Sequence, residues 1–252
     1  MILGALSCVP APVVAQFGPD TIGAKLLRPI VNRAVASGES EVEVQCGVGK
    51  GLRLGVHLRH EKYYFTGSHE PWVQQAIADR LRPGMIFWDV GAHIGFHTLS
   101  ASRIVTASGM VRAFEPSSEN RQRLLANIHR NNASNVVVES CAVGADAGSV
   151  MLYEHSSSTM RSLIPEREQS LGEVVTCRTL DELSLSNLPP DLIKIDVEGA
   201  ELDVLNGAQH LLRSVHPILI IEFLSAERLG EARKLLTSYT LQHIGGKDWL
   251  AT

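Results

Sequence analysis

From Met85 onward, short apolar runs alternate with stretches of helical periodicity, and this alternation limits the fold more than any other sequence feature. Short apolar runs are typical of strands that are buried on both faces. Strands that alternate with helices are joined by right-handed crossovers, so we predict a mostly parallel sheet with helices on both faces. The predicted strands are Met85–Val90, Val111–Phe114, Val136–Val138, Leu192–Ile195 and Ile218–Phe223, and the predicted helices are Ile94–Val105, Ser118–Arg130, Ala200–Leu212 and Ala226–Ser238.

The C-terminal end of this region carries a different signal. Thr240–Ile244 and Trp249–Leu250 flank a glycine-containing turn, which predicts two further strands, the last of them antiparallel. The stretch from Val150 to Leu183 fits a simple alternating sheet least well. Either extra strands, at Met151–Tyr153 and Val174–Cys177, or a loop is predicted there.

The residues before the alternation predict an N-terminal extension. Thr21–Ala36 has apolar residues at helical spacing, and Val42–Cys46 and Leu52–Leu58 alternate on either side of a glycine-rich turn, as in a β-hairpin. Pro71 suits the first turn of a helix that runs to about Leu81. We therefore predict an N-terminal arm, helix and β-hairpin over residues 1–69 and an α/β domain over residues 70–252.

The composition argues against several classes of partner. The net charge is −4, and no run of Lys and Arg exceeds two residues, so a surface that tracks phosphates is not expected. No apolar run reaches the about 18 residues of a membrane helix. Met1–Pro19 lacks charge, which resembles a signal peptide, but the missing basic start and Pro10 and Pro12 favour a packed arm. Four widely spaced cysteines favour reduced thiols in the cytoplasm.

The turn after the first parallel strand carries the first chemical signal. Its glycines, Gly91 and Gly95, would let a ligand approach the backbone closely, and their Gly-x-x-x-Gly spacing differs from that of dinucleotide sites. Asp89 ends the strand, where its carboxylate would repel a pyrophosphate. It suits a positively charged ligand, such as the amino group and sulfonium of S-adenosylmethionine.

Two later strands also end in acids. Glu115 follows the next strand, where a carboxylate can accept both hydroxyls of a ribose, although N-capping of the following helix is the structural alternative. Asp196 ends the strand 192–195, and Glu198 and Glu201 follow it. These acids could bind an acceptor, remove a proton or hold a metal. Glu201 is better explained as an acid in the first turn of the predicted helix, where it favours the helix N-terminus.

With these segments the sequence resembles the FkbM family of methyltransferases. The resemblance covers roughly Tyr64 to Phe223 and implies a Rossmann-like methyltransferase fold and O-methylation of sugars or secondary metabolites. Its most specific part is the long Asp-Val-Glu-Gly-Ala-Glu stretch. The residues that carry it lie in Asp89–Gly95, Phe114–Pro116, Asn127–Asn132, Thr179–Glu182, Ile193–Glu201 and Pro217–Glu222.

The resemblance also implies which residues bind S-adenosylmethionine. Glu115 would bind the ribose, Ala142 would border the adenine, and Glu70 belongs to an element that would close over the cofactor. His93 stands where many relatives carry Asn, and it is four residues before His97, so the two could share a helix face as ligands, although ordinary packing is favoured. The full predicted set is Glu70, Asp89, Gly91, Ala92, His93, Gly95, Glu115 and Ala142.

Methylation of an alcohol also needs a base within hydrogen-bond reach. We predict Asp196 for this role, with His155 and Glu198 as alternatives. Asp196 and Glu222 end neighbouring strands, so they could instead share a divalent metal, which would lower the pKa of an acceptor hydroxyl.

Two rival functions are an NAD-linked oxidoreductase and a non-catalytic protein that binds S-adenosylmethionine. The oxidoreductase would need the other glycine spacing, and no tyrosine is followed by lysine four positions later. Hydrolase and P-loop signatures are absent from the sequence. The expected partner is a small-molecule acceptor, not a nucleic acid or a membrane, and the N-terminal arm and hairpin suit a homodimer.

Overall fold

The computed structural model describes residues 38–154, 161–162 and 172–252, and all structural statements below concern these residues. The N-terminal arm, the helix predicted at Thr21–Ala36 and His155 lie outside them. Among the described residues, no helix is both long enough and apolar enough to cross a membrane.

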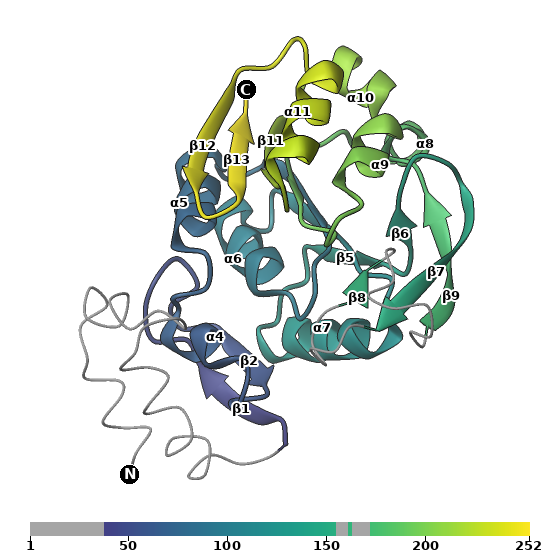
Figure 1. The fold of residues 1–252 in the computed structure, drawn as a ribbon. Coiled ribbons are helices and arrows are strands. Elements are labelled where there is room, and N and C mark those ends of the chain that lie inside the picture. Colours follow the sequence, from purple (N-terminus) through teal and green to yellow (C-terminus); the bar gives the residue numbers. More distant parts are fainter. Residues whose placement is uncertain (1–37, 155–160, 163–171) are drawn as a thin grey trace.

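A seven-stranded sheet forms the centre of the molecule (Figure 1). Five strands are parallel, as predicted, and β13 lies antiparallel between β11 and β12. The order is β12-β13-β11-β10-β3-β4-β5. The bounds are β3 Ile86–Val90, β4 Met110–Phe114, β5 Val136–Glu139, β10 Leu192–Ile195, β11 Ile218–Glu222, β12 Leu241–Gly245 and β13 Asp248–Ala251.

Helices cover both faces of this sheet because its central strands are apolar on both sides. Phe87 packs with residues of the helices on one face, and its neighbour Trp88 packs with residues of the helices on the other. Leu124 contributes to a smaller cluster with Ala113 of β4. The first face carries α5 (Pro71–Arg80), α6 (Phe96–Val105) and α7 (Ser118–Arg130), and the second carries α8 (Leu180–Ser186), α9 (Glu201–Asn206), α10 (Gln209–Ser214) and α11 (Ala226–Leu235).

The single helix predicted at Ala200–Leu212 is wrong, because the chain forms α9 and α10 with a break after Asn206. A side chain at Gly207 would overlap the carbonyl oxygen of Gly144, so the backbones approach too closely for another residue. The carboxylate of Asp181 accepts hydrogen bonds from the backbone N–H groups at the start of α10. These tertiary contacts favour a new helix start over continuation of α9.

A second, four-stranded sheet accounts for the stretch that fitted the alternation poorly. Of the two alternatives predicted there, the extra strands are confirmed inside β7 and β9, which pair antiparallel. The order is β6-β9-β7-β8. The bounds are β6 Ala142–Val143, β7 Gly148–Glu154, β8 Arg161–Ser162 and β9 Gly172–Arg178.

The predicted N-terminal hairpin is also confirmed, with shorter strands, β1 (Ser40–Glu43) and β2 (Arg53–Val56). It is followed by a short helix, α4 (Lys62–Thr66), that the sequence analysis did not predict. Val42, Leu54 and Tyr64 form one buried cluster with Phe96 and Leu99 of α6. The hairpin and α4 therefore pack directly on the α/β body, and the boundary between residues 69 and 70 stays a prediction.

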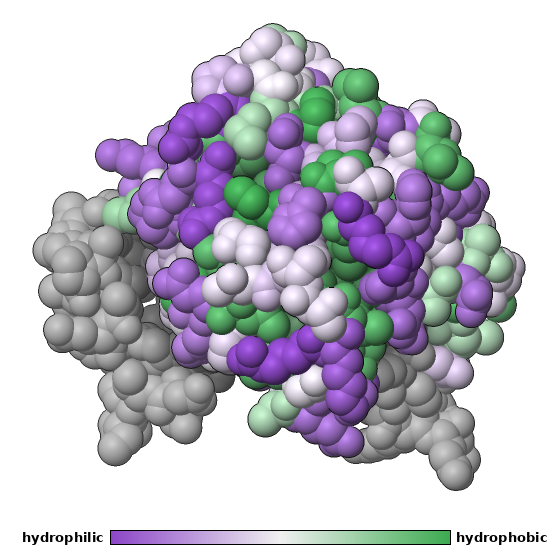
Figure 2. All heavy atoms as spheres, turned by 90° about the horizontal axis from the view of Figure 1, so that it is seen from above, coloured by the Kyte–Doolittle hydropathy of each residue, from purple (hydrophilic) through white to green (hydrophobic). Residues whose placement is uncertain are grey.

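On the face shown in Figure 2, seen from the side of α10 and α11, hydrophilic residues surround smaller groups of hydrophobic ones. Apolar residues on a protein surface are ordinary when they are scattered. Two large clusters of buried apolar residues lie between the sheet and its helices.

A buried ion pair joins α4 to α7. Glu61 is fully buried at the N-cap of α4, and both of its carboxylate oxygens accept hydrogen bonds from Arg123, at 2.5 and 3.0 Å. The backbone N–H of His57 donates a third hydrogen bond to Glu61, at 2.7 Å. Burial by itself would raise the pKa of Glu61, but the hydrogen bonds and charge of Arg123 outweigh it and lower that pKa. The pair fixes the position of α4 on the body.

We expect Glu61→Gln to lower the free energy of unfolding by about 3–5 kcal/mol, because the buried Arg123 would lose its buried partner and keep only the longer ion pair with Glu39, at 3.5 Å. Urea unfolding at pH 7 measures this loss. The control is Lys234→Gln, which breaks the exposed Lys234–Glu231 pair and should change stability by less than about 0.5 kcal/mol. Equal effects of the two variants would contradict a structural role for the Glu61–Arg123 pair.

Candidate functional site

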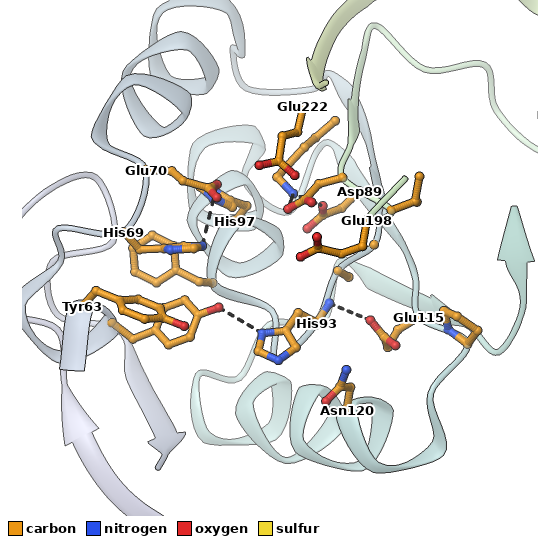
Figure 3. A pocket seen from close by; sticks show the side chains of 18 of the residues that line it. Tyr63, His69, Glu70, Asp89, His93, His97, Glu115, Asn120, Glu198 and Glu222 are labelled. Atoms are coloured by element: carbon orange, nitrogen blue, oxygen red, sulfur yellow. Dashed lines mark hydrogen bonds and ion pairs between the residues drawn. The ribbon is translucent and has the colours of Figure 1, made fainter. Parts of the chain in front are cut away.

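A cavity of about 570 Å³ opens at the carboxyl ends of the central parallel strands (Figure 3). Its wall includes Asp89 of β3, Glu115 after β4, Asp196 after β10 and Glu222 of β11. The strand order runs outward from β3 to β5 on one side and from β10 to β11 on the other, so the cavity lies where the strand order reverses. Ligands of open α/β sheets bind at this switch point.

The turn 91–95 is held by the next strand. The backbone N–H groups of Gly91 and Ala92 both donate to the carbonyl oxygen of Phe114, at 3.1 Å. Gly91 has φ +87°, and a side chain there would overlap the carbonyl oxygen of Asp196. The glycine is thus required because the segments after β3 and β10 approach each other closely.

Asp89 and Lys194 form a buried charged pair on neighbouring strands. Asp89 is 1% exposed, and its Oδ2 accepts a hydrogen bond of 2.5 Å from the Thr98 hydroxyl. Its Oδ1 accepts no hydrogen bond from any described residue and lies 4.0 Å from Nζ of Lys194. Nζ of Lys194 lies 2.9 Å from Oδ2 of Asp196. Burial alone would lower the pKa of Lys194, but the carboxylates of Asp196, Asp89 and Glu70 outweigh it and raise that pKa.

Glu115 is buried at the end of β4 and faces the cavity. Its carboxyl group accepts hydrogen bonds from the backbone N–H of His93, at 2.8 Å, and of Ser117, at 2.9 Å. Burial outweighs these hydrogen bonds and raises the pKa of Glu115 to about 7. The group can therefore gain or lose a proton near neutral pH.

Glu70 reaches the cavity from the start of α5. It adopts a left-handed backbone conformation, with φ 42°. Although burial opposes ionisation, the imidazoles of His69 and His97 and the Lys194 ammonium hold the pKa of Glu70 well below its usual range. Because Glu70 is ionised, Nε2–H of His97 must be the donor in their 2.9 Å hydrogen bond.

Aromatic rings form the opposite wall of the cavity (Figure 3). Tyr63 of α4 stacks on His69, with ring centroids 5.0 Å apart. The hydroxyl of Tyr64 hydrogen-bonds to Nδ1 of His93 at 3.0 Å. Burial lowers the pKa of His93 to about 4, so its ring is neutral at neutral pH. Nε2 of His93 has no hydrogen-bond partner among the described residues.

The proposed pairing of His93 and His97 on one helix face is wrong. Helix α6 begins at Phe96, and His93 precedes it with φ 50°. The two imidazoles therefore point to different partners, Tyr64 and Glu70. The spacing of four residues implied a shared face only if the helix began earlier.

Three acids gather at the ends of β10 and β11. Carboxylate oxygens of Asp196, Glu198 and Glu222 all lie within 4.8 Å of one another. Burial and the charges of Asp196 and Glu198 raise the pKa of Glu222 to about 8. Glu222 forms a long ion pair with the exposed Lys247, whose Nζ lies 3.9 Å from Oε1 of Glu222.

The remaining predicted site residues lie beside the cavity or outside the described chain. Ala142 lines a smaller apolar pocket, which shares Gly91, Pro116 and Val197 with the main cavity. Gly95 is the N-cap of α6 with φ 91° and is not part of the cavity wall. His155 lies outside the described residues.

Sequence reasoning missed most of the aromatic wall. Tyr63 and Tyr64 lie on α4, whose five residues are too few for a recognisable helical period. A signal was nevertheless present, because two adjacent tyrosines precede the Gly-Ser-His-Glu-Pro stretch that contains Glu70. Arg59 and His60, at the rim of the same cavity, carried no comparable signal.

A family model described as "Methyltransferase FkbM domain" matches residues 89–242, more than half of the chain. The chain belongs to the FkbM methyltransferase family. The predicted resemblance is confirmed, and the methyltransferase interpretation is favoured over an oxidoreductase. The match spans β3 to β12, so Tyr63, Tyr64 and His69 of the aromatic wall lie before the matched region, whereas His93 lies inside it.

Two curated relatives support the same assignment. The chain is 27% identical over 169 residues to "Hexuronic acid methyltransferase AglP" of Haloferax volcanii, an alignment that covers 62% of this chain and 63% of the relative. It is 30% identical over 142 residues to "Methyltransferase 1" of Beauveria bassiana, which covers 47% of this chain and 56% of the relative. The chain therefore spans about three fifths of the length of these relatives.

A solved structure is similar in fold. "Methyltransferase FkbM" from Methylobacillus flagellatus KT superposes with a TM-score of 0.51 at 17% identity and covers 94% of this chain and 60% of that one. The Rossmann-like fold expected from the resemblance is confirmed.

Gly91→Ala is expected to lower the free energy of unfolding by at least about 3 kcal/mol, because a β-carbon would be strained at this φ and would also overlap Asp196. Thermal and urea unfolding measure the change. The matched control is Gly230→Ala in α11, where the added atom meets nothing within 4 Å. There the better helix propensity of alanine should stabilise the protein by about 0.5–1 kcal/mol. Similar stability of both variants would contradict the close approach at Gly91.

Proposed function

We propose that the protein transfers a methyl group from S-adenosylmethionine to a hydroxyl group of a sugar or a related small molecule. The observation that carries the proposal is the set of carboxyl groups around the switch-point cavity of an FkbM-family chain. Such a cavity favours a ligand with an ammonium and a sulfonium and disfavours the pyrophosphate of NAD. These carboxyl groups belong to Glu70, Asp89, Glu115, Asp196, Glu198 and Glu222.

The residues present fit the donor. The unpartnered Oδ1 of Asp89 is a buried acceptor suited to an ammonium group. Glu115 would accept the ribose hydroxyls, and the apolar pocket at Ala142 would hold the adenine. If the Tyr64 hydroxyl donates its hydrogen bond to Nδ1 of His93, Nε2 of His93 carries the ring proton. Nε2–H could then donate a hydrogen bond to the carboxylate of S-adenosylmethionine. When bound, S-adenosylmethionine supplies an electrophilic methyl group.

A carbohydrate acceptor is supported by the name of the archaeal relative and by the cavity rim. Arg59 and Tyr63 line the cavity beside His60. A guanidinium pairs well with a carboxylate, and an aromatic ring offers an apolar face to a sugar. We therefore place uronic acids first among the acceptors to be tested, ahead of neutral sugars and secondary metabolites.

The two predicted metal ligands, Asp196 and Glu222, lie close to each other and to Glu198. A divalent cation there would come near the Lys194 ammonium, which already pairs with Asp196 at 2.9 Å. Like charges repel strongly in a buried site. We therefore propose a reaction that needs a base among these acids and no metal.

Binding of S-adenosylmethionine should weaken as the pH falls below about 7, because Glu115, whose pKa is about 7, must be ionised to accept both ribose hydroxyls. The expected loss is about tenfold per pH unit below that pKa and little change above it. Calorimetry between pH 5.5 and 8.5 measures this. Glu115→Gln should bind more weakly than wild type above pH 7, should approach wild-type affinity at the acidic end of the range, and should lose the dependence. Binding of NAD without binding of S-adenosylmethionine would refute the proposed function.

Labelled-methyl transfer should be detected with glucuronic acid or another hydroxyl acceptor in a panel of uronic acids, neutral sugars and secondary metabolites. The readout is label in the purified acceptor. With EDTA present, the rate should stay within about twofold, because the proposed base needs no metal. Loss of turnover in EDTA that Mg²⁺ restores would instead assign a cation to Asp196 and Glu222. Tight donor binding with no transfer to any acceptor would favour a non-catalytic protein.

A further inference from the structure

We propose that Glu222 is the base that takes the proton from the acceptor hydroxyl, and that Asp196 is kept from this role by Lys194. The inference rests on the proposed function and assigns its proton-transfer step to one residue. The sequence alone predicts the opposite assignment, with Asp196 as the base and Glu222 as a possible metal ligand.

The sheet places Glu222 beside Asp196. Ile195 of β10 pairs in register with Ile221 of β11, so the residue that follows each of them lies at the same edge of the sheet. Both acids line the main cavity, and their carboxylate oxygens lie within 4.8 Å of each other. Either carboxylate could therefore meet the same acceptor hydroxyl.

Lys194 distinguishes the two acids. Lys194 is 3% exposed, and its Nζ lies 2.9 Å from Oδ2 of Asp196. A proton on Asp196 would remove the closest partner of this buried ammonium and leave it with Asp89 at 4.0 Å, which is costly. Glu222 has no such partner in the described chain, because its ion pair with the exposed Lys247 is 3.9 Å long. An exposed pair of this length contributes little. Glu222 is thus the acid that can gain a proton at the lower cost.

The charges that face Glu222 favour its protonated form. Asp196 and Glu198 approach it from the segment after β10, and Asp248 pairs with it in register from β13. Lys247, from the turn before β13, is the opposing positive charge. Burial is the largest influence and the acids add to it, so the pKa of Glu222 rises to about 8. A base whose pKa lies near the working pH accepts a proton more readily than an ordinary carboxylate.

The proposed step balances as an in-line transfer. The acceptor O–H bond breaks as its proton passes to a carboxylate oxygen of Glu222, and the acceptor oxygen forms a bond to the methyl carbon. The bond between that carbon and sulfur breaks, and its electron pair stays on sulfur. The products are a methyl ether, S-adenosylhomocysteine and protonated Glu222. The Glu222 side chain is 19% exposed, so the proton can then leave to water.

The test compares pH profiles of methyl transfer to glucuronic acid, or to the panel acceptor with the fastest turnover. The wild-type rate should rise with pH and level off above about pH 8, because only ionised Glu222 accepts the proton. Glu222→Gln should lower kcat by at least about 100-fold and lose this rise. If only the base is lost, its melting temperature should be unchanged and its affinity for S-adenosylmethionine should stay within about threefold of wild type, both measured on the same sample.

Two further variants move the profile in opposite directions. Glu198→Gln removes a negative charge facing Glu222 and should shift the rise to lower pH, whereas Lys247→Gln removes a positive charge and should shift it to higher pH. Asp196→Asn should lower the rate but keep a pH-dependent rise. A flat profile in Asp196→Asn or Glu198→Gln, with a rise retained in Glu222→Gln, would overturn the proposal.

A measurement without an acceptor separates this proposal from the proposed function. In protein labelled with carboxyl-¹³C glutamate, the resonance that Glu222→Gln removes should titrate near pH 8 and move to lower pH in Glu198→Gln. Titration of that resonance at the ordinary glutamate pKa of about 4.3 would refute the role of Glu222 even where donor binding is normal. Failure to bind S-adenosylmethionine would instead refute the proposed function itself.

Discussion

The site depends on the ion pairs that the buried ammonium of Lys194 forms with two carboxylates. Lys194 lies on β10 at the switch point, between Asp89 on the neighbouring strand and Asp196 two residues later. Without this cation, the carboxylates of two adjacent strands would repel one another in a poorly solvated space. With it, a positive charge lies between the two carboxylates. Burial raises the pKa of Glu115, and burial together with the charges of Asp196 and Glu198 raises the pKa of Glu222.

The same cavity also concentrates backbone strain. Glu70, His93 and Glu198 have positive φ although none of them is glycine, and all three line the cavity. Such conformations persist only where the surroundings enforce them. Glu70 is held by its hydrogen bond with His97, and the adjoining helix is held by Trp72, whose indole N–H donates to Asp248 at 2.6 Å. The strain therefore places side chains of three separate segments around one space.

The two walls of the cavity have different origins in the chain. The carboxylate wall comes from segments inside the region that matches the FkbM family, apart from Glu70. The aromatic wall comes largely from α4 and the turn before α5, which precede that region, and α4 is positioned by the buried Glu61–Arg123 pair. A donor common to a family and an acceptor particular to one member would divide in this way between a shared wall and a variable one.

The sequence by itself determined how strands and helices alternate along the α/β part of the chain. It also determined which acids end the strands. This was possible because a buried strand and an amphipathic helix each have a local period, and because parallel strands bring their carboxyl ends to one edge. The sequence predicts Asp89 and Glu115 at the donor and Asp196 and Glu222 on neighbouring strands, and the structure places all four in one cavity.

Only the tertiary structure decided how the surroundings of those acids differ from one another. Several contacts of the site form only through packing. They are the Lys194–Asp196 pair, the Glu70–His97 hydrogen bond, the stacking of Tyr63 on His69 and the buried Glu61–Arg123 pair. Local period carries no information on such contacts, because the partners are either far apart in the chain or oriented by distant segments. Charge neighbours and burial set the pKa of a carboxyl group, so only the folded chain could separate Glu222 from Asp196.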